Sequence, residues 1–195
     1  MIRRQRGFLL VVALALAGCG INAIPTNDEA VKASWGQVEN QYQRRADLVP
    51  NLVNTVKGYA EHERATLEAV VEARAKVSQM NISPDIVDEP QALQSFERNQ
   101  AALSSALSRL LVVVERYPDL KANQNFLELQ AQLEGTENRI AVARRDYVQS
   151  VQRYNTEIRT FPGRFWHSIL YSDLPVRETF EAREDAATGP KYGGY

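Results

Sequence analysis

The sequence predicts an all-α protein, folded as an elongated antiparallel bundle of three to four long helices. Three long stretches repeat apolar residues every three or four positions, which is the spacing of a helix that buries one face. Short segments rich in proline and turn-forming residues separate these stretches, and helices joined by short connections pack antiparallel. No stretch alternates apolar and polar residues as a half-buried strand does, so no sheet is expected.

The first nineteen residues have the layout of a secretory signal. Three arginines precede an apolar run over residues 8–16, and the sequence Leu-Ala-Gly-Cys ends at Cys19. The run is shorter than the roughly 20 apolar residues that cross a bilayer, while the order of basic, apolar and small residues is that of a cleaved signal. A cysteine directly after Leu-Ala-Gly resembles the bacterial lipobox. That resemblance implies cleavage before Cys19 and a diacylglyceryl group on its sulfur.

We therefore expect a lipoprotein signal peptide over residues 1–18 and a tether over residues 19–26. The mature protein is then lipid-anchored and extracytoplasmic, on the periplasmic face of the inner or the outer membrane. Removing residues 1–18 takes away three of the 23 basic residues and none of the 24 acidic ones, which leaves a net charge of −4. Because an acidic chain has no excess of cations to release phosphate counterions, no nucleic-acid partner is expected.

Residues 27–80 are predicted to be helical. Capping residues precede the helix, and Asp28 and Glu29 are placed where the helix dipole favours acidic side chains. Proline removes one helical hydrogen bond and crowds the carbonyl four residues earlier, so Pro50 predicts a kink or a break near residues 48–50. The sequence does not decide between one kinked helix and two. The apolar stripe consists of Val31, Trp35, Val38, Tyr42, Val49, Leu52, Val56, Val70 and Val77.

Two further long helices are predicted, over residues 91–117 and residues 123–160. A loop at residues 81–90 precedes the second helix, and a turn that contains proline precedes the third. The motif Phe-Pro-Gly ends the third helix, so the bundle is expected over residues 27–163 and an irregular tail over residues 164–195. The stripes are Leu93, Phe96, Gln100, Leu103, Leu107, Leu110 and Val114 in the second helix, and Phe126, Leu133, Ile140, Tyr147, Tyr154 and Phe161 in the third.

Charged residues that interrupt the apolar stripes form the first candidate site. Because buried charges need partners, one hypothesis is a polar layer inside the bundle, in which Arg44 or Arg45 pairs with Glu137 or another acid. The alternatives are that these side chains lie at the edge of the seam with their charged ends in water, or that they tie the proline-containing segment to an adjacent helix. The candidate residues are Arg44, Arg45, Asp47, Asn51, Glu137 and Arg144.

A second candidate site follows the third helix, in the segment FPGRFWHSILY at residues 161–171. Phe165, Trp166 and Tyr171 form an aromatic patch that suits a protein partner or a membrane-facing edge. The alternative is that Phe165, Trp166 and Leu170 fold back and cover the end of the bundle.

No motif for catalysis or metal binding is present. The two histidines, His62 and His167, lack the glutamate three residues before them that a di-iron carboxylate bundle needs. The sequence contains no His-Glu-x-x-His, no Gly-x-Ser-x-Gly and no phosphate-binding glycine loop. We expect no cofactor, no metal and no enzymatic activity.

Four segments resemble the LemA family. They are WGQVENQYQRRADLVPNLVNTVKGYAEHE at residues 35–63, LEAVVEARAKV at 67–77, YPDLKANQNFLELQAQLEGTENRIAVARRDY at 117–147 and YNTEIRTFPG at 154–163. The resemblance implies an antiparallel helical bundle held at a bacterial membrane by its N-terminus, without an established enzymatic activity. Family members usually have an N-terminal transmembrane helix where this chain has the lipobox-like segment, and usually an asparagine at the position of Val148.

These features predict a non-enzymatic, lipid-anchored bundle that scaffolds or binds membrane or envelope proteins. One alternative is a module that binds a small ligand or the cell wall in a groove near Pro50. Another is an accessory to a membrane protease, because some members of the family are thought to accompany such proteases. The sequence gives neither the partner nor the oligomeric state.

Overall fold

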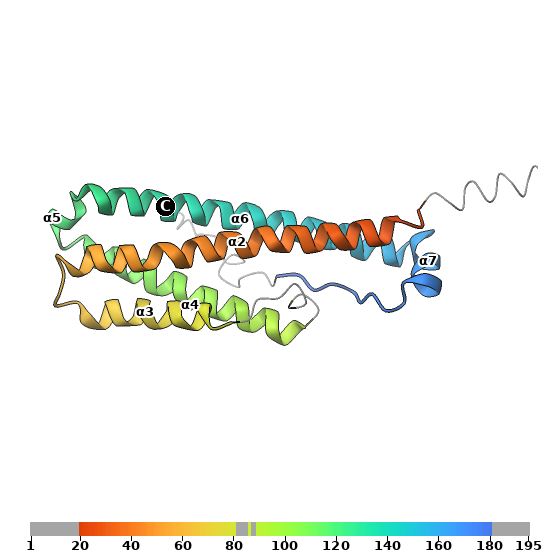
Figure 1. The fold of residues 1–195 in the computed structure, drawn as a ribbon, viewed down its shortest axis with the longest axis horizontal. Helices are drawn as coiled ribbons and strands as arrows, with labels where there is room; N and C mark the ends of the chain where they lie inside the picture. The colour runs from red at the N-terminus through yellow and green to blue at the C-terminus, as the bar shows by residue number, and fades with distance from the viewer. Residues whose placement is uncertain (1–19, 81–85, 87–88, 181–195) are drawn as a thin grey trace, which may run out of the picture.

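A computed structural model describes residues 20–80, 86 and 89–180, and this part of the chain is helical without any strand (Figure 1). The prediction of an all-α fold is confirmed. Cys19 and residues 181–195 lie outside the described residues. The helices are α2 (Ala23–Lys57), α3 (Arg64–Ser78), α4 (Pro90–Val114), α5 (Pro118–Lys121), α6 (Gln124–Arg159) and α7 (Gly163–Leu170).

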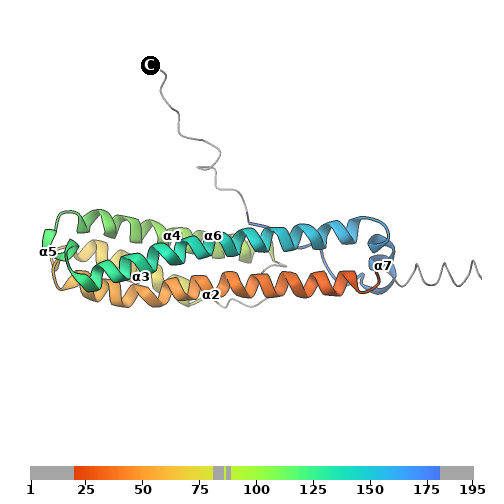
Figure 2. The same ribbon diagram turned by 90° about the horizontal axis from the view of Figure 1, so that it is seen from above.

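The two longest helices, α2 and α6, lie antiparallel along the full length of the molecule (Figures 1 and 2). α3 and α4 form a second antiparallel pair, which packs beside them over the part nearer to α5. α5 connects α4 to α6 at one end of the bundle, and α7 lies at the other end. The bundle therefore has four long helices towards α5 but only two at its α7 end.

α2 begins before the predicted start of the first helix. It starts at Ala23, so the last part of the predicted tether is helical, and Ile24 is already fully buried. Asp28 therefore lies in the second turn of the helix and not in the first, and its side chain is buried. The burial of Ile24 explains the earlier start, because packing stabilises a helical turn that local propensity leaves open.

α2 continues through Pro50 without a break. Proline has no amide hydrogen, so the carbonyl oxygen of Ala46 lacks its usual helical partner. The Nε of Arg74 in α3 donates to that oxygen at 2.9 Å. A side chain of the neighbouring helix replaces the missing donor, and of the two predicted alternatives at residues 48–50 the break is wrong.

The first predicted helix is interrupted instead at residues 58–63, between α2 and α3. Gly58 directly follows α2 and has a low helix propensity, and Ala60 is buried where the chain reverses. Val56 and Val70 stay in the same heptad register on the two sides of this turn. Periodicity alone therefore predicted one helix where the structure has two.

The buried apolar side chains form two clusters. The cluster nearer to α5, here the aliphatic cluster, joins α2, α3, α4 and α6 mainly through valine, leucine and alanine. The cluster nearer to α7, here the aromatic cluster, is centred on Trp35, which is fully buried. Its ring contacts those of Phe96, Tyr147 and Phe180 at centroid distances of 5.4 to 5.9 Å.

The segment after α6 is more ordered than the irregular tail that the sequence predicted. Gly163–Leu170 form α7. Residues 172–180, which we call the strap, have no regular secondary structure and return from α7 towards the middle of the bundle (Figure 1). A Cβ on Gly163 would lie 2.2 Å from the carbonyl oxygen of Glu157, so only glycine permits the tight turn from α6 into α7.

Candidate functional site

Arg45 of α2 is the centre of the polar layer between the two core clusters. Its side chain is almost fully buried, and one end of the guanidinium group, Nη1, donates to Glu137 Oε1 of α6 at 2.9 Å and to Ser104 Oγ of α4 at 2.6 Å. The other end, Nη2, donates to the backbone and side-chain carbonyl oxygens of Gln100. One side chain therefore links three helices, and the structure brings Arg45 together with Glu137, as one of the sequence hypotheses has it.

Arg144 of α6 makes a second interhelical contact, nearer to the aromatic cluster. Its guanidinium group donates to the hydroxyl of Tyr42 at 3.1 Å and to Glu97 Oε1 at 3.0 Å, which joins α6 to α2 and α4. The same group lies 3.8 Å from the ring centroid of Phe180, a cation–π contact with the strap. Arg144 thus joins α6 to α2, to α4 and to the strap.

The other predicted polar residues lie on the surface of α2. Arg44, Asp47 and Asn51 are exposed, and Asp47 accepts a hydrogen bond from the side chain of Gln43 at 2.8 Å. The structure does not bring these three residues to the buried contacts of Arg45. The candidate cluster is therefore divided between residues that join helices, which are Arg45, Glu137 and Arg144, and residues on a solvated face.

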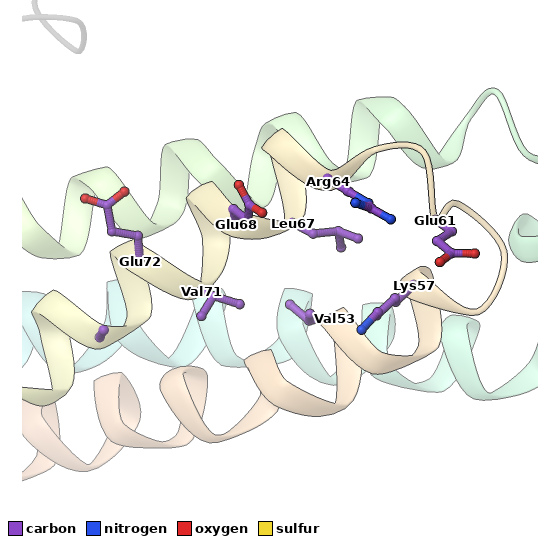
Figure 3. A pocket seen from close by; sticks show the side chains of 9 residues that line it. Val53, Lys57, Glu61, Arg64, Leu67, Glu68, Val71 and Glu72 are labelled. Carbon is purple, nitrogen blue, oxygen red and sulfur yellow. The ribbon is translucent and has the colours of Figure 1, made fainter.

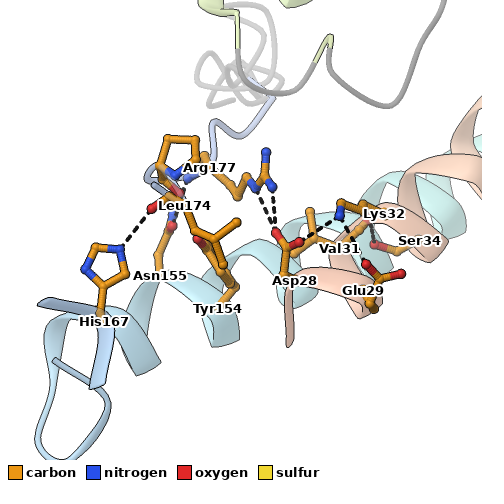
Figure 4. Close-up of polar contacts among 11 residues, drawn as sticks. Asp28, Glu29, Val31, Lys32, Ser34, Tyr154, Asn155, His167, Leu174 and Arg177 are labelled. Carbon is orange, nitrogen blue, oxygen red and sulfur yellow. Dashed lines mark hydrogen bonds and ion pairs between the residues drawn. The ribbon is translucent and has the colours of Figure 1, made fainter. Parts of the chain in front are cut away.

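Sequence reasoning missed a buried ion pair between Asp28 and Arg177 of the strap (Figure 4). The Nη2 and Nε of Arg177 lie 2.6 and 3.2 Å from Asp28 Oδ1, and Lys32 Nζ lies 2.9 Å from Oδ2. Burial alone would raise the pKa of Asp28, but the hydrogen bonds and charges of Lys32 and Arg177 outweigh it and hold that pKa below its usual value. The sequence contained a signal for the burial of Asp28, because this residue occupies a position of the apolar stripe, three residues before Val31.

Two tyrosines of α6 bind the backbone of the strap. The hydroxyl of Tyr154 donates to the carbonyl oxygen of Pro175 at 2.9 Å, and that of Tyr147 donates to the carbonyl oxygen of Glu178 at 2.8 Å. Burial, with smaller contributions from nearby carboxylates, raises the pKa of Tyr154 to about 12. Both phenols are therefore neutral donors at physiological pH, and they fix the strap against α6.

The predicted aromatic patch is divided by α7. Trp166 and Tyr171 are half-buried and pack against the aromatic cluster, so they cover the end of the bundle. Phe165 contacts the ring of Trp166 at a centroid distance of 5.1 Å but is 51% exposed. Of the three residues, Phe165 alone presents most of its surface to solvent.

An open groove between α2 and α3 has a volume of about 600 Å³ (Figure 3). Val53, Leu67 and Val71 line it with apolar surface, and acidic and basic side chains, among them Lys57 and Glu68, surround them. The groove lies towards the α5 end of the bundle, beyond Pro50, the residue near which the sequence predicts a groove. Its rim of mixed charge favours neither an anionic nor a cationic ligand.

Residues 20–80, 86 and 89–180 contain neither a cluster of metal ligands nor a membrane-spanning helix. No three acidic, histidine or cysteine side chains of these residues gather as a metal site requires. His167 is engaged with the carbonyl oxygen of Leu174 at 2.9 Å. None of the described helices has the length and apolar character needed to cross a bilayer.

A sequence model of the LemA family matches residues 34–192. The chain belongs to the LemA family. Protein LemA of Metamycoplasma hominis is 23% identical over 165 residues, which cover 84% of this chain and 69% of that protein. Magnetosome protein MamQ 2 of Paramagnetospirillum magneticum is 24% identical over 166 residues, covering 77% of this chain and 60% of that protein. MamQ of Magnetospirillum gryphiswaldense is 24% identical over 157 residues, covering 72% and 58%.

The resemblance to the LemA family is thereby confirmed, and the family match includes α7 and the strap. This LemA family member spans about 60% of the length of the MamQ relatives that it matches. The family and the MamQ similarity indicate a membrane-associated helical protein. Neither LemA proteins nor MamQ are known enzymes.

Proposed function

We propose that this protein is a lipid-anchored, non-enzymatic rod of the bacterial envelope that binds or scaffolds membrane or envelope proteins. The proposal depends on the observation that the buried and half-buried arginines bind other parts of the protein itself. Arg45, Arg144 and Arg177 each bind side chains of other helices or segments, and none of the three lines the groove of Figure 3. Such groups stabilise a stiff body, whereas a catalytic site brings polar groups to a cavity.

Cys19 supplies the anchor in this proposal. Its lipobox-like context supports acylation, and membership of a membrane-associated family supports a membrane location. Mass spectrometry of the N-terminal peptide should find a Cys19 that carries acyl chains, and the mature protein should sediment with membranes. An unmodified thiol at Cys19 in membrane-derived protein would contradict the anchor.

The partner is tested by crosslinking in intact cells. A photoreactive residue at Val112 of α4 or at Val142 of α6, both of which are exposed, should form protein adducts of discrete mass. The same residues in the Cys19→Ser variant are the matched control, because they lack the anchor but keep the surface. Adducts with lipid alone at both positions would contradict the scaffold proposal.

The groove between α2 and α3 favours a second candidate function, a module that binds small molecules or cell-wall fragments. A ligand that binds only the folded state raises the melting temperature. Soluble cell-wall fragments should therefore raise the melting temperature of the wild type but not that of Val71→Glu, which places a charge in the groove. Val112→Glu is the control, because it places the same charge on α4, outside the groove. Equal shifts in all three proteins would exclude the groove.

A further inference from the structure

The outer side of α7 carries large apolar side chains that the bundle leaves uncovered. Phe165 and Ile169 are 51% and 58% exposed, and Phe161, just before the helix, is 87% exposed. Phe165 and Ile169 are four residues apart and therefore lie on one side of the helix. We call Phe161, Phe165 and Ile169 the apolar end face. Single exposed apolar residues are common on protein surfaces, but several at one end of a molecule often mark a contact surface.

α7 is held in a fixed orientation, so the apolar end face points away from the bundle. On its inner side His167 bonds to the carbonyl oxygen of Leu174, and Trp166 packs against the aromatic cluster. The turn at Gly163 leaves no room for a side chain. The exposure of the apolar end face thus follows from a constrained turn and from contacts of the opposite side.

The charges around α7 suit a lipid surface. Arg159 and Arg164 are exposed beside the apolar end face, whereas the nearby acidic side chains are Glu157, which is half-buried, and Asp173, which is exposed. Helices that lie in a membrane interface combine apolar residues on one side with basic residues at its edge, and the basic residues favour anionic headgroups.

The start of the described chain lies at the same end of the bundle. A Cβ on Gly20 would lie 3.4 Å from Cγ of Pro162, so Gly20 lies against the residue that precedes α7. Consecutive Cα atoms are only 3.8 Å apart. A lipid on Cys19 would therefore enter a bilayer immediately beside α7.

We propose that the apolar end face of α7 inserts into the surface of an anionic bilayer, so that the rod stands on the membrane with its α5 end directed away from it. This inference rests on the proposed lipid anchor at Cys19. The anchor keeps α7 beside the bilayer, so the contact of α7 with the bilayer becomes intramolecular. Even a weak contact is then occupied.

A second copy of the chain fits this surface less well than a bilayer does. α7 has eight residues, which makes it about 12 Å long. Stable protein interfaces bury roughly 1,200–2,000 Å² in total, more than two side chains of so short a helix and one side chain before it supply. A fluid lipid surface, by contrast, needs only a small apolar area that points towards it.

The test uses spin labels on the acylated mature protein in vesicles of phosphatidylethanolamine and phosphatidylglycerol. Because Cys19 is the only cysteine and is blocked by lipid in this proposal, a cysteine introduced by Ile169→Cys is the single free thiol. Val112→Cys, exposed in α4, is the matched control. The ratio of collision with oxygen to collision with a water-soluble nickel complex should be several-fold higher at residue 169 than at residue 112.

A double substitution tests whether the apolar side chains of the end face make the contact with the bilayer. Phe161→Ser combined with Phe165→Ser should lower the ratio at residue 169 towards that at residue 112, whereas Val142→Ser in α6 should leave it unchanged. Equal ratios at the two labels in the wild type would overturn the proposal, as would high ratios at both, since the rod would then lie flat. Spin–spin broadening at residue 169 without lipid exposure would identify a second copy as the occupant and would also overturn it.

The anchor itself is read separately, by flotation of the vesicles and by the mass of the N-terminal peptide. Protein that does not float and has an unmodified Cys19 refutes the proposed anchor. Protein that floats with an acylated Cys19, but whose label at residue 169 remains in water, refutes only the contact of α7.

Discussion

The two halves of the bundle fill their cores with different side chains. Towards α5, four long helices surround the aliphatic cluster, in which Phe126 is the one aromatic residue among the buried members described. Towards α7, the first two turns of α4 still contribute Leu93 and Phe96 to the aromatic cluster, and beyond them the strap covers α2 and α6 in place of the other pair (Figure 1). This half is packed with rings, Trp35 and Tyr154 among them, and contains the ion pair of Asp28 with Arg177.

The difference follows from what covers the two long helices. A helix satisfies its own backbone, but a strap without regular structure carries carbonyl groups that need donors wherever they are buried. Tyr147 and Tyr154 provide such donors from rings that also bury apolar area. Asn155 adds two more hydrogen bonds, to the backbone N–H and carbonyl of Arg177. The aromatic and charged composition of this half thus compensates for the missing helices.

The largest effect is expected from a cavity in the aliphatic half, where mainly the packing of apolar side chains joins the helices. Leu110→Ala removes a fully buried side chain of α4 and should lower the free energy of unfolding by about 3 kcal/mol. Val112→Ala, two residues further along the same helix and 71% exposed, should change it by less than about 0.5 kcal/mol. Urea denaturation followed by circular dichroism measures both, and similar losses would show that this core is not closely packed.

In the aromatic half, removal of one ionic partner should release the strap. Asp28→Asn leaves Arg177 buried without its carboxylate and should cost about 2 kcal/mol, because the strap can detach and hydrate the guanidinium group. Hydrogen exchange should accelerate at the amides of residues 172–180 and stay unchanged in α4. The control Glu29→Gln alters an exposed neighbour that also binds Lys32. Slow exchange of the strap in Asp28→Asn would mean that the ion pair does not hold it.

The same ion pair predicts a dependence on acid. The folded protein lowers the pKa of Asp28, so its stabilisation is complete above the unfolded pKa, about 4, and is lost as the pH falls through the lower folded value. The difference in unfolding free energy between wild type and Asp28→Asn should therefore be constant from about pH 7 to pH 5 and shrink below about pH 4. A difference that persists undiminished at the lowest pH would point to packing in place of charge.

The smallest effect is expected where the two halves meet. Glu137 binds Arg45, but its side chain is 44% exposed, and Arg45 keeps Ser104 and Gln100 as partners. Glu137→Leu should therefore change the free energy of unfolding by less than about 1 kcal/mol. Glu134→Leu, on the exposed side of α6, serves as the control. A much larger loss at residue 137 than at residue 134 would make Glu137 a required partner of Arg45.

Periodicity predicted the helices of this fold well because three of them are long and bury one continuous stripe. It failed at the turn after α2, because Val56 and Val70 keep the same heptad register on both sides of that turn. It also failed in α7, which is too short to show a period. Pro50 could not be settled from the sequence, because the compensating donor, Arg74, comes from a helix whose placement depends on that turn.

The candidate site was predictable to the extent that its residues lie on a stripe. Arg45 lies three residues after Tyr42 and four before Val49, which marks it, and not Arg44, as the buried arginine. Asp28 follows the same rule, but its partner Arg177 lies in a segment without any periodicity. Contacts between a helix and such a segment depend on the path of the chain in three dimensions, which no local pattern specifies.

The length of α6 has one further consequence. Its 36 residues, at a rise of 1.5 Å each, extend over about 54 Å, and α2 runs beside it for nearly the whole distance. The groove of Figure 3 lies towards the opposite tip from α7. Whatever docks there is separated from whatever touches α7 by a nearly constant gap, because two long helices packed together resist bending. The protein then acts as a molecular spacer, whose reach is set by a count of helical turns.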